Sequence, residues 1–162
     1  MANVKRQMLR ASIKKQGFTM LEIAISMGII ILISILGIRS FSKFRGNNAL
    51  GVSRDTVVTA LLEARNLTLF SKEASVYGVH FASTTITIFK GATYIPNASS
   101  NKIYNIDSSV VVSNLNLNPF AYDVLFARLT GLPDRYGNIE LKLISGTKST
   151  SSVSLGSGGI AQ

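Results

Sequence analysis

The feature that most constrains this chain is an apolar run near its N-terminus, directly preceded by a basic segment. From Ile23 to Ile38 every residue is apolar or small, apart from the hydroxyl groups of two serines. Counted from Phe18 to Ile38, the run has roughly 21 residues, which as an α-helix extend about 30 Å, the thickness of a bilayer's hydrocarbon core. The run therefore predicts a membrane-spanning helix.

The net charge of +9 is concentrated around this run. Residues 1–17 contain five basic residues and no acid, whereas residues 46–162 contain nine basic and seven acidic residues. An excess of positive charge before the run favours an N-terminus in the cytoplasm. The dispersed charge of residues 46–162 does not indicate a nucleic-acid-binding face, although DNA binding stays open as an alternative.

Two simpler interpretations of the N-terminus fit less well. A secretory signal peptide has about 7 to 15 apolar residues followed by a small-x-small cleavage site, and the sequence RSFSKFRG after the run offers no such site. A plain single-span anchor leaves Glu22 unexplained, because an unpaired carboxylate costs about 2.5 kcal/mol or more at mid-depth in a bilayer and less near its edge.

The stretch GFTMLE at residues 17–22, followed by the apolar run, resembles the class III signal of type IV pilins and type II secretion pseudopilins. The resemblance implies that a prepilin peptidase cleaves between Gly17 and Phe18 and methylates the new amine. It also implies that Glu22 pairs with the amine of a neighbouring subunit during assembly. A glutamate that snorkels to the membrane surface is the alternative. The proline that many members carry near the end of the span is absent.

These features divide the chain into a basic leader (1–17), a transmembrane and assembly helix (18–45) and a globular head (46–162). Helix is expected over about 53–73, capped by Asp55, with a break in the preceding helix near Gly46 to Gly51. Val57, Leu61 and Ala64 recur at helical spacing and predict the buried stripe, which is widened by a further set of apolar residues: Val58, Leu62 and Leu69.

The rest of the head is predicted to be β-rich. Short β-branched or aromatic runs alternate with turn residues at 77–81, 84–89, 109–113, 123–129, 138–144 and 151–155. The expected fold class is α+β, with a long N-terminal helix, consisting of a transmembrane half and an amphipathic half, packed on a small antiparallel β-sheet. This layout resembles the minor pseudopilins of the GspH/FimT type.

The sequence indicates no catalytic, cofactor or metal site. It has no cysteine, which excludes thiol chemistry, cysteine-type zinc sites and disulfides. His80 is the single histidine and has no partner nearby in the sequence, so a structural role is predicted. The acidic residues of the head are scattered, without calcium-loop spacing. The chain is therefore not expected to be an enzyme.

Together with the resemblance, these observations predict a structural subunit of a type IV pilus (fimbrium) or of a pseudopilus for protein secretion. The expected partners are other pilin or pseudopilin subunits, the prepilin peptidase and the membrane. The expected location is the inner (cytoplasmic) membrane, crossed once, with the head on the extracytoplasmic side. The alternatives are a DNA-uptake minor pilin and a plain single-span membrane-anchored protein.

Overall fold

The computed structural model describes residues 17–145 and 149–161, with the side chains of 36–40 and 159–161 left out. The predicted leader therefore lies outside the described residues, except for Gly17. The chain divides into two compact units, Met1–Ser40 and Phe41–Gln162. The α-helix α1 (Met20–Leu69) has residues in both units.

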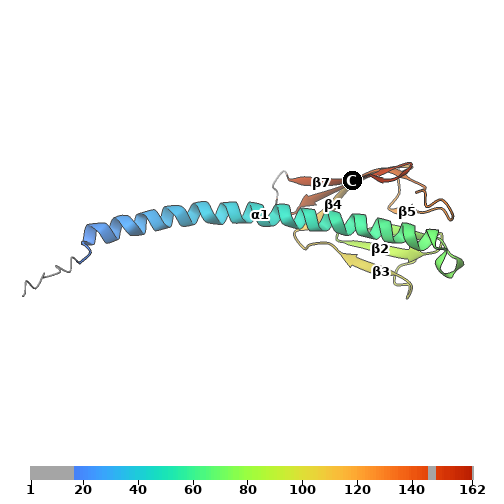
Figure 1. The fold of residues 1–162 in the computed structure, drawn as a ribbon, viewed down its shortest axis with the longest axis horizontal. Helices are drawn as coiled ribbons and strands as arrows, with labels where there is room; N and C mark the ends of the chain where they lie inside the picture. Colours follow the sequence, from blue (N-terminus) through green and yellow to red (C-terminus); the bar gives the residue numbers. More distant parts are fainter. Residues whose placement is uncertain (1–16, 146–148, 162) are drawn as a thin grey trace, which may run out of the picture. The chain divides into compact units, whose positions relative to one another are not determined.

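In the second unit, α1 is followed by a single 3-10 turn, η1 (Lys72–Ala74), and by short strands (Figure 1). The strands are β1 (Tyr77–Phe81), β2 (Thr85–Lys90), β3 (Lys102–Asn105), β4 (Val110–Asn118), β5 (Asp123–Leu125), β6 (Tyr136–Leu143), β7 (Thr150–Gly156) and β8 (Gly159–Ala161).

The strands form two four-stranded sheets, with the orders β3-β2-β1-β5 and β4-β6-β7-β8. All of their pairings are antiparallel, as predicted. The prediction of one small sheet is wrong, because β4 pairs with β6 and not with a strand of the first sheet. Figure 1 shows β2 and β3 below the helix and β7 above it. Strand β3 was not predicted, since its side chains are mostly exposed and show no buried alternation.

The core of the second unit lies between α1 and the two sheets. Val57, Leu61 and Ala64 are fully buried, which confirms the predicted stripe. The sheets contribute inward-facing residues to the same cluster, among them Val79, Phe81, Ile139, Leu141 and Val153. Leu62 was predicted to widen the stripe but is 40% exposed. One residue turns a helix by about 100°, so Leu62 lies away from the face that Leu61 buries.

Two predictions about the course of the helix are also wrong. The helix does not break near Gly46 to Gly51, nor does it begin at Asp55, because α1 passes through both. A Cβ at Gly46 would lie 2.9 Å from Leu143 Cδ1, so this glycine allows close packing rather than bending. The helix ends at Leu69 instead of Glu73 because the next residues leave helical geometry, with positive φ at Ser71, Glu73 and Ala74.

The predicted membrane span is not found. In the part of the chain that the structure describes, no helix combines the length and the hydrophobicity needed to traverse a bilayer. The predicted transmembrane half and the single-pass inner-membrane location are therefore corrected. The fold class becomes an α+β unit in which the helix, from Phe41 to Leu69, packs on two antiparallel sheets.

Candidate functional site

The start of α1 carries the three residues predicted for processing and assembly. Gly17 and Phe18 precede the helix, and Glu22 lies in its first turn. Together with Thr19 they surround one surface depression, so the structure brings all three together.

Thr19 gives Glu22 a local role that the sequence reasoning missed. The backbone N–H of Glu22 donates a hydrogen bond to Thr19 Oγ1 at 3.2 Å, which makes Thr19 the N-cap of the helix. Glu22 is then the third helical residue, where a carboxylate interacts favourably with the helix dipole. The signal was present, because Thr-x-x-Glu before an apolar run is a capping pattern.

An extensive apolar surface follows this site. Every described side chain from residue 17 to residue 35 is exposed. Residues 29–33 are all large and apolar, and successive residues of a helix point in different directions, so the surface surrounds the helix. We call it the N-terminal apolar surface, and its large residues are Phe18, Met20, Leu21, Ile23, Ile25, Met27, Ile29, Ile30, Ile31, Leu32, Ile33 and Ile35.

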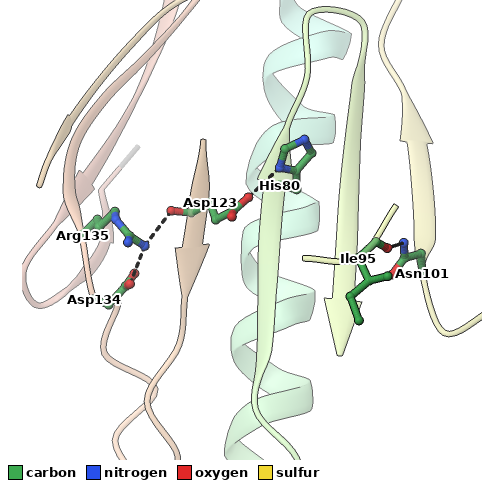
Figure 2. Close-up of polar contacts among 6 residues, drawn as sticks. All are labelled: His80, Ile95, Asn101, Asp123, Asp134 and Arg135. Atoms are coloured by element: carbon green, nitrogen blue, oxygen red, sulfur yellow. Dashed lines mark hydrogen bonds and ion pairs between the residues drawn. The ribbon is translucent and has the colours of Figure 1, made fainter. Parts of the chain in front are cut away.

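A polar cluster in the second unit contains the only histidine. His80 on β1 and Asp123 on β5 are direct cross-strand neighbours, and His80 Nδ1 lies 2.5 Å from Asp123 Oδ1 (Figure 2). The imidazole also stacks on the ring of Tyr94, with centroids 3.9 Å apart and planes at 6°. The sequence did not reveal Asp123 as a partner, because strand pairing brings it close from 43 positions away.

Two further residues, Arg135 and Asp134, bind β5 on the side away from His80 (Figure 2). Arg135 Nη1 donates to the backbone carbonyl of Asp123 at 2.9 Å and to Asp134 Oδ2 at 2.5 Å (Figure 2). Asp134 Oδ1 in turn accepts a hydrogen bond from the N–H of Leu125 at 2.8 Å. A His–Asp pair can move a proton, but among the described residues no hydrogen bond joins His80 to a nucleophilic hydroxyl. These contacts hold the edge strand β5 against its neighbours.

A third group of charges attaches the edge strand β3 to α1. Glu63 accepts hydrogen bonds from Lys102 Nζ at 2.7 Å and from the Tyr104 hydroxyl. Burial acts to raise the pKa of Glu63, but the hydrogen bonds from Lys102 and Tyr104 outweigh it and leave that pKa below its ordinary value. The hydrogen bond to Glu63 raises the pKa of Lys102 to about 12.

Metal binding has no support in the described residues, since no group of three His, Asp or Glu side chains is close enough to hold an ion. The comparisons with known proteins add no name: no protein-family profile, no curated protein and no solved structure matches this chain. The functional interpretation therefore rests on its own residues.

Proposed function

We propose that this chain is a structural subunit that polymerises through its N-terminal helix, in the manner of type IV pilins and type II secretion pseudopilins, and that it has no catalytic activity. The observation that supports the proposal best is the N-terminal apolar surface, which is exposed over residues 17–35. Exposed apolar areas of this extent mark contact surfaces. Helices of neighbouring subunits would cover it.

Processing is the first step of the proposal. A prepilin peptidase would cleave between Gly17 and Phe18, remove the leader and methylate the new amine. Both residues are exposed and precede the helix, so the bond is accessible to a peptidase. The intact mass of the chain, co-expressed with a prepilin peptidase, should correspond to a product that begins at methylated Phe18. Recovery of the uncut chain would contradict the proposal.

Assembly is the second step, and it depends on Glu22. Among the described residues, the ion pairs do not include Glu22. In an interface made of apolar helices, its carboxylate would pair with the Phe18 amine of a neighbouring subunit. Removing one partner of such a pair leaves the other charge buried alone, so the pair selects the register of assembly more than it adds stability.

Two variants distinguish the effect of the Glu22 charge on assembly from the effect of the helix cap. Glu22→Gln removes the charge but keeps a side chain that suits the third helical position, whereas Thr19→Ala removes the cap and keeps the charge. Loss of a buried pair costs about 3 to 5 kcal/mol, and each 1.4 kcal/mol is about tenfold in an equilibrium constant. Glu22→Gln should therefore lower assembly more than about a hundredfold.

The measurement is the yield of fibres, or of cross-linked processed subunits, at matched protein levels. Thr19→Ala should assemble much better than Glu22→Gln, because capping contributes only about 1 kcal/mol. Equal yields from Glu22→Gln and the unchanged chain would remove the pairing role. Equal losses of yield in the two variants would show that assembly depends on the start of the helix and not on the charge of Glu22.

A further inference from the structure

A pocket of about 370 Å³ opens where the two sheets of the second unit come together. Two of its lining residues are joined by a hydrogen bond of 2.9 Å from the N–H of Val112 to the carbonyl of Ser83. Its volume falls in the range of pockets that hold small ligands. The residues that line it include no charged side chain, and among them are Phe81, Ser83, Ser113, Asn114, Phe120 and Tyr122.

Two exposed aromatic rings line the pocket. Phe120 is 66% exposed and Tyr122 is 57% exposed. Their ring centroids lie 5.5 Å apart with planes at 72°, so the rings make a corner. The carbonyl of Tyr122 accepts a hydrogen bond from the N–H of Phe81 at 2.8 Å, which ties the backbone at Tyr122 to β1. The backbone that carries the Tyr122 ring is thus held in place before any ligand arrives, which lowers the cost of binding.

Polar, uncharged side chains also line the pocket. The register of β4 against β6 shifts between Val112 and Asn114, which leaves Ser113 as the extra residue of a bulge. Asn114 is exposed beside it, and its amide offers both donors and an acceptor. The Ser113 hydroxyl donates to the Glu140 carbonyl at 3.2 Å and can still accept a hydrogen bond.

We infer that this pocket binds a neutral oligosaccharide. A sugar ring has an apolar C–H face that fits against an aromatic ring, and hydroxyl groups that pair with amide and hydroxyl side chains. A charged ligand would lose hydration without finding an opposite charge among the lining residues. A purely apolar ligand would cover the Asn114 amide without offering it a hydrogen-bond partner. The inference does not depend on polymerisation of the chain.

An extended peptide is the main competing ligand, because β4 is an edge strand of its sheet. A peptide that adds to a sheet edge requires a regular row of unpaired backbone groups. The bulge between Val112 and Asn114 interrupts that row, and the N–H of Val112 is already bonded to Ser83. These two features favour the oligosaccharide.

The test is isothermal titration calorimetry with cellohexaose, maltohexaose and chitohexaose, and with an oligogalacturonate as the charged comparison. The full chain is kept in a zwitterionic detergent without a sugar headgroup, because of its N-terminal apolar surface. At least one neutral hexaose should bind, and Phe120→Ala and Tyr122→Ala should each weaken it about tenfold. Tyr122→Phe keeps the ring and should retain most of the affinity.

The matched control is Phe70→Ala, which removes an exposed aromatic ring that does not line the pocket and should leave binding unchanged. Absence of binding by all three neutral hexaoses at millimolar concentration would overturn the inference. So would unchanged affinity in both Phe120→Ala and Tyr122→Ala, or equally tight binding of the oligogalacturonate. Binding of an extended peptide in place of the sugars would identify strand addition instead.

Discussion

The helix α1 has different surroundings in the two units of the chain. From Phe41 to Leu69, one face is buried by two sheets, and Val57 and Leu61 are fully inaccessible. From residue 17 to residue 35, no described side chain is buried. The second unit therefore buries apolar residues of its own helix, whereas the described apolar side chains of the first unit stay exposed.

The largest expected effect tests this contrast by removing apolar side chains in both units. Leu61→Ala should lower the free energy of unfolding of the second unit by about 2 to 5 kcal/mol, because it leaves a cavity in the core. Its neighbour Leu62 is 40% exposed, so Leu62→Ala should cost only about 0.5 kcal/mol. Urea denaturation of the full chain, followed by circular dichroism, measures both.

Ile30→Ala extends the same experiment to the N-terminal apolar surface. It should leave unfolding of the second unit unchanged, because Ile30 is exposed and belongs to the other unit. A loss as large as that of Leu61→Ala would show that the second unit covers Ile30. Equal effects of Leu61→Ala and Leu62→Ala would contradict the assignment of the buried face.

The sequence predicted those parts of the fold that carry a local pattern. Helical spacing located the stripe at Val57, Leu61 and Ala64, and runs of β-branched or aromatic residues located most strands. It did not predict that the strands form two sheets, because strand order depends on pairing between distant segments. Strand β3 was missed since an exposed edge strand lacks the buried alternation that marks a strand.

In the candidate site, too, the sequence predicted what is local in the chain and missed what depends on distant strand pairing. Gly17, Phe18 and Glu22 are neighbours in the sequence, so a motif was sufficient to group them, and the Thr19 cap was readable from the same stretch. Asp123 could not be found as the partner of His80, because only the register of β1 with β5 brings them together.

A smaller effect is expected where glycines of the helix differ in their surroundings. A Cβ at Gly51 would meet no atom within 4 Å, so Gly51→Ala should stabilise the second unit by about 0.5 to 1 kcal/mol through helix propensity. Gly46→Ala should stabilise less or destabilise, because its Cβ would lie 2.9 Å from Leu143 Cδ1. Thermal unfolding of both variants measures the difference. A larger gain for Gly46→Ala would show that the helix is not packed on β6 there.

The smallest effect concerns the two glutamates of α1, one in each unit. The carboxylate of Glu63 accepts hydrogen bonds from Lys102 and Tyr104, whereas the hydrogen bonds that join Glu22 to Thr19 and Ser26 involve only the backbone of Glu22. Glu63→Gln should destabilise the second unit by about 0.5 to 1 kcal/mol at neutral pH, as is usual for a partly exposed ion pair. Glu22→Gln should leave this unfolding transition unchanged.

The pH dependence of the Glu63→Gln effect identifies its cause. The pKa of Glu63 is lowered in the folded chain, so its stabilisation is complete above the ordinary value of about 4.3 and is lost as the pH falls through the lower, folded value. The pKa of Lys102 is raised to about 12. The stabilisation that the charge of Lys102 contributes is therefore fully present at neutral pH and is lost only in strongly alkaline solution. The difference in unfolding free energy between the unchanged chain and Glu63→Gln should therefore be constant from about pH 6 to 8 and shrink below about pH 4. A difference that stays the same in acid would assign the effect of Glu63 to packing against Tyr104 rather than to its charge.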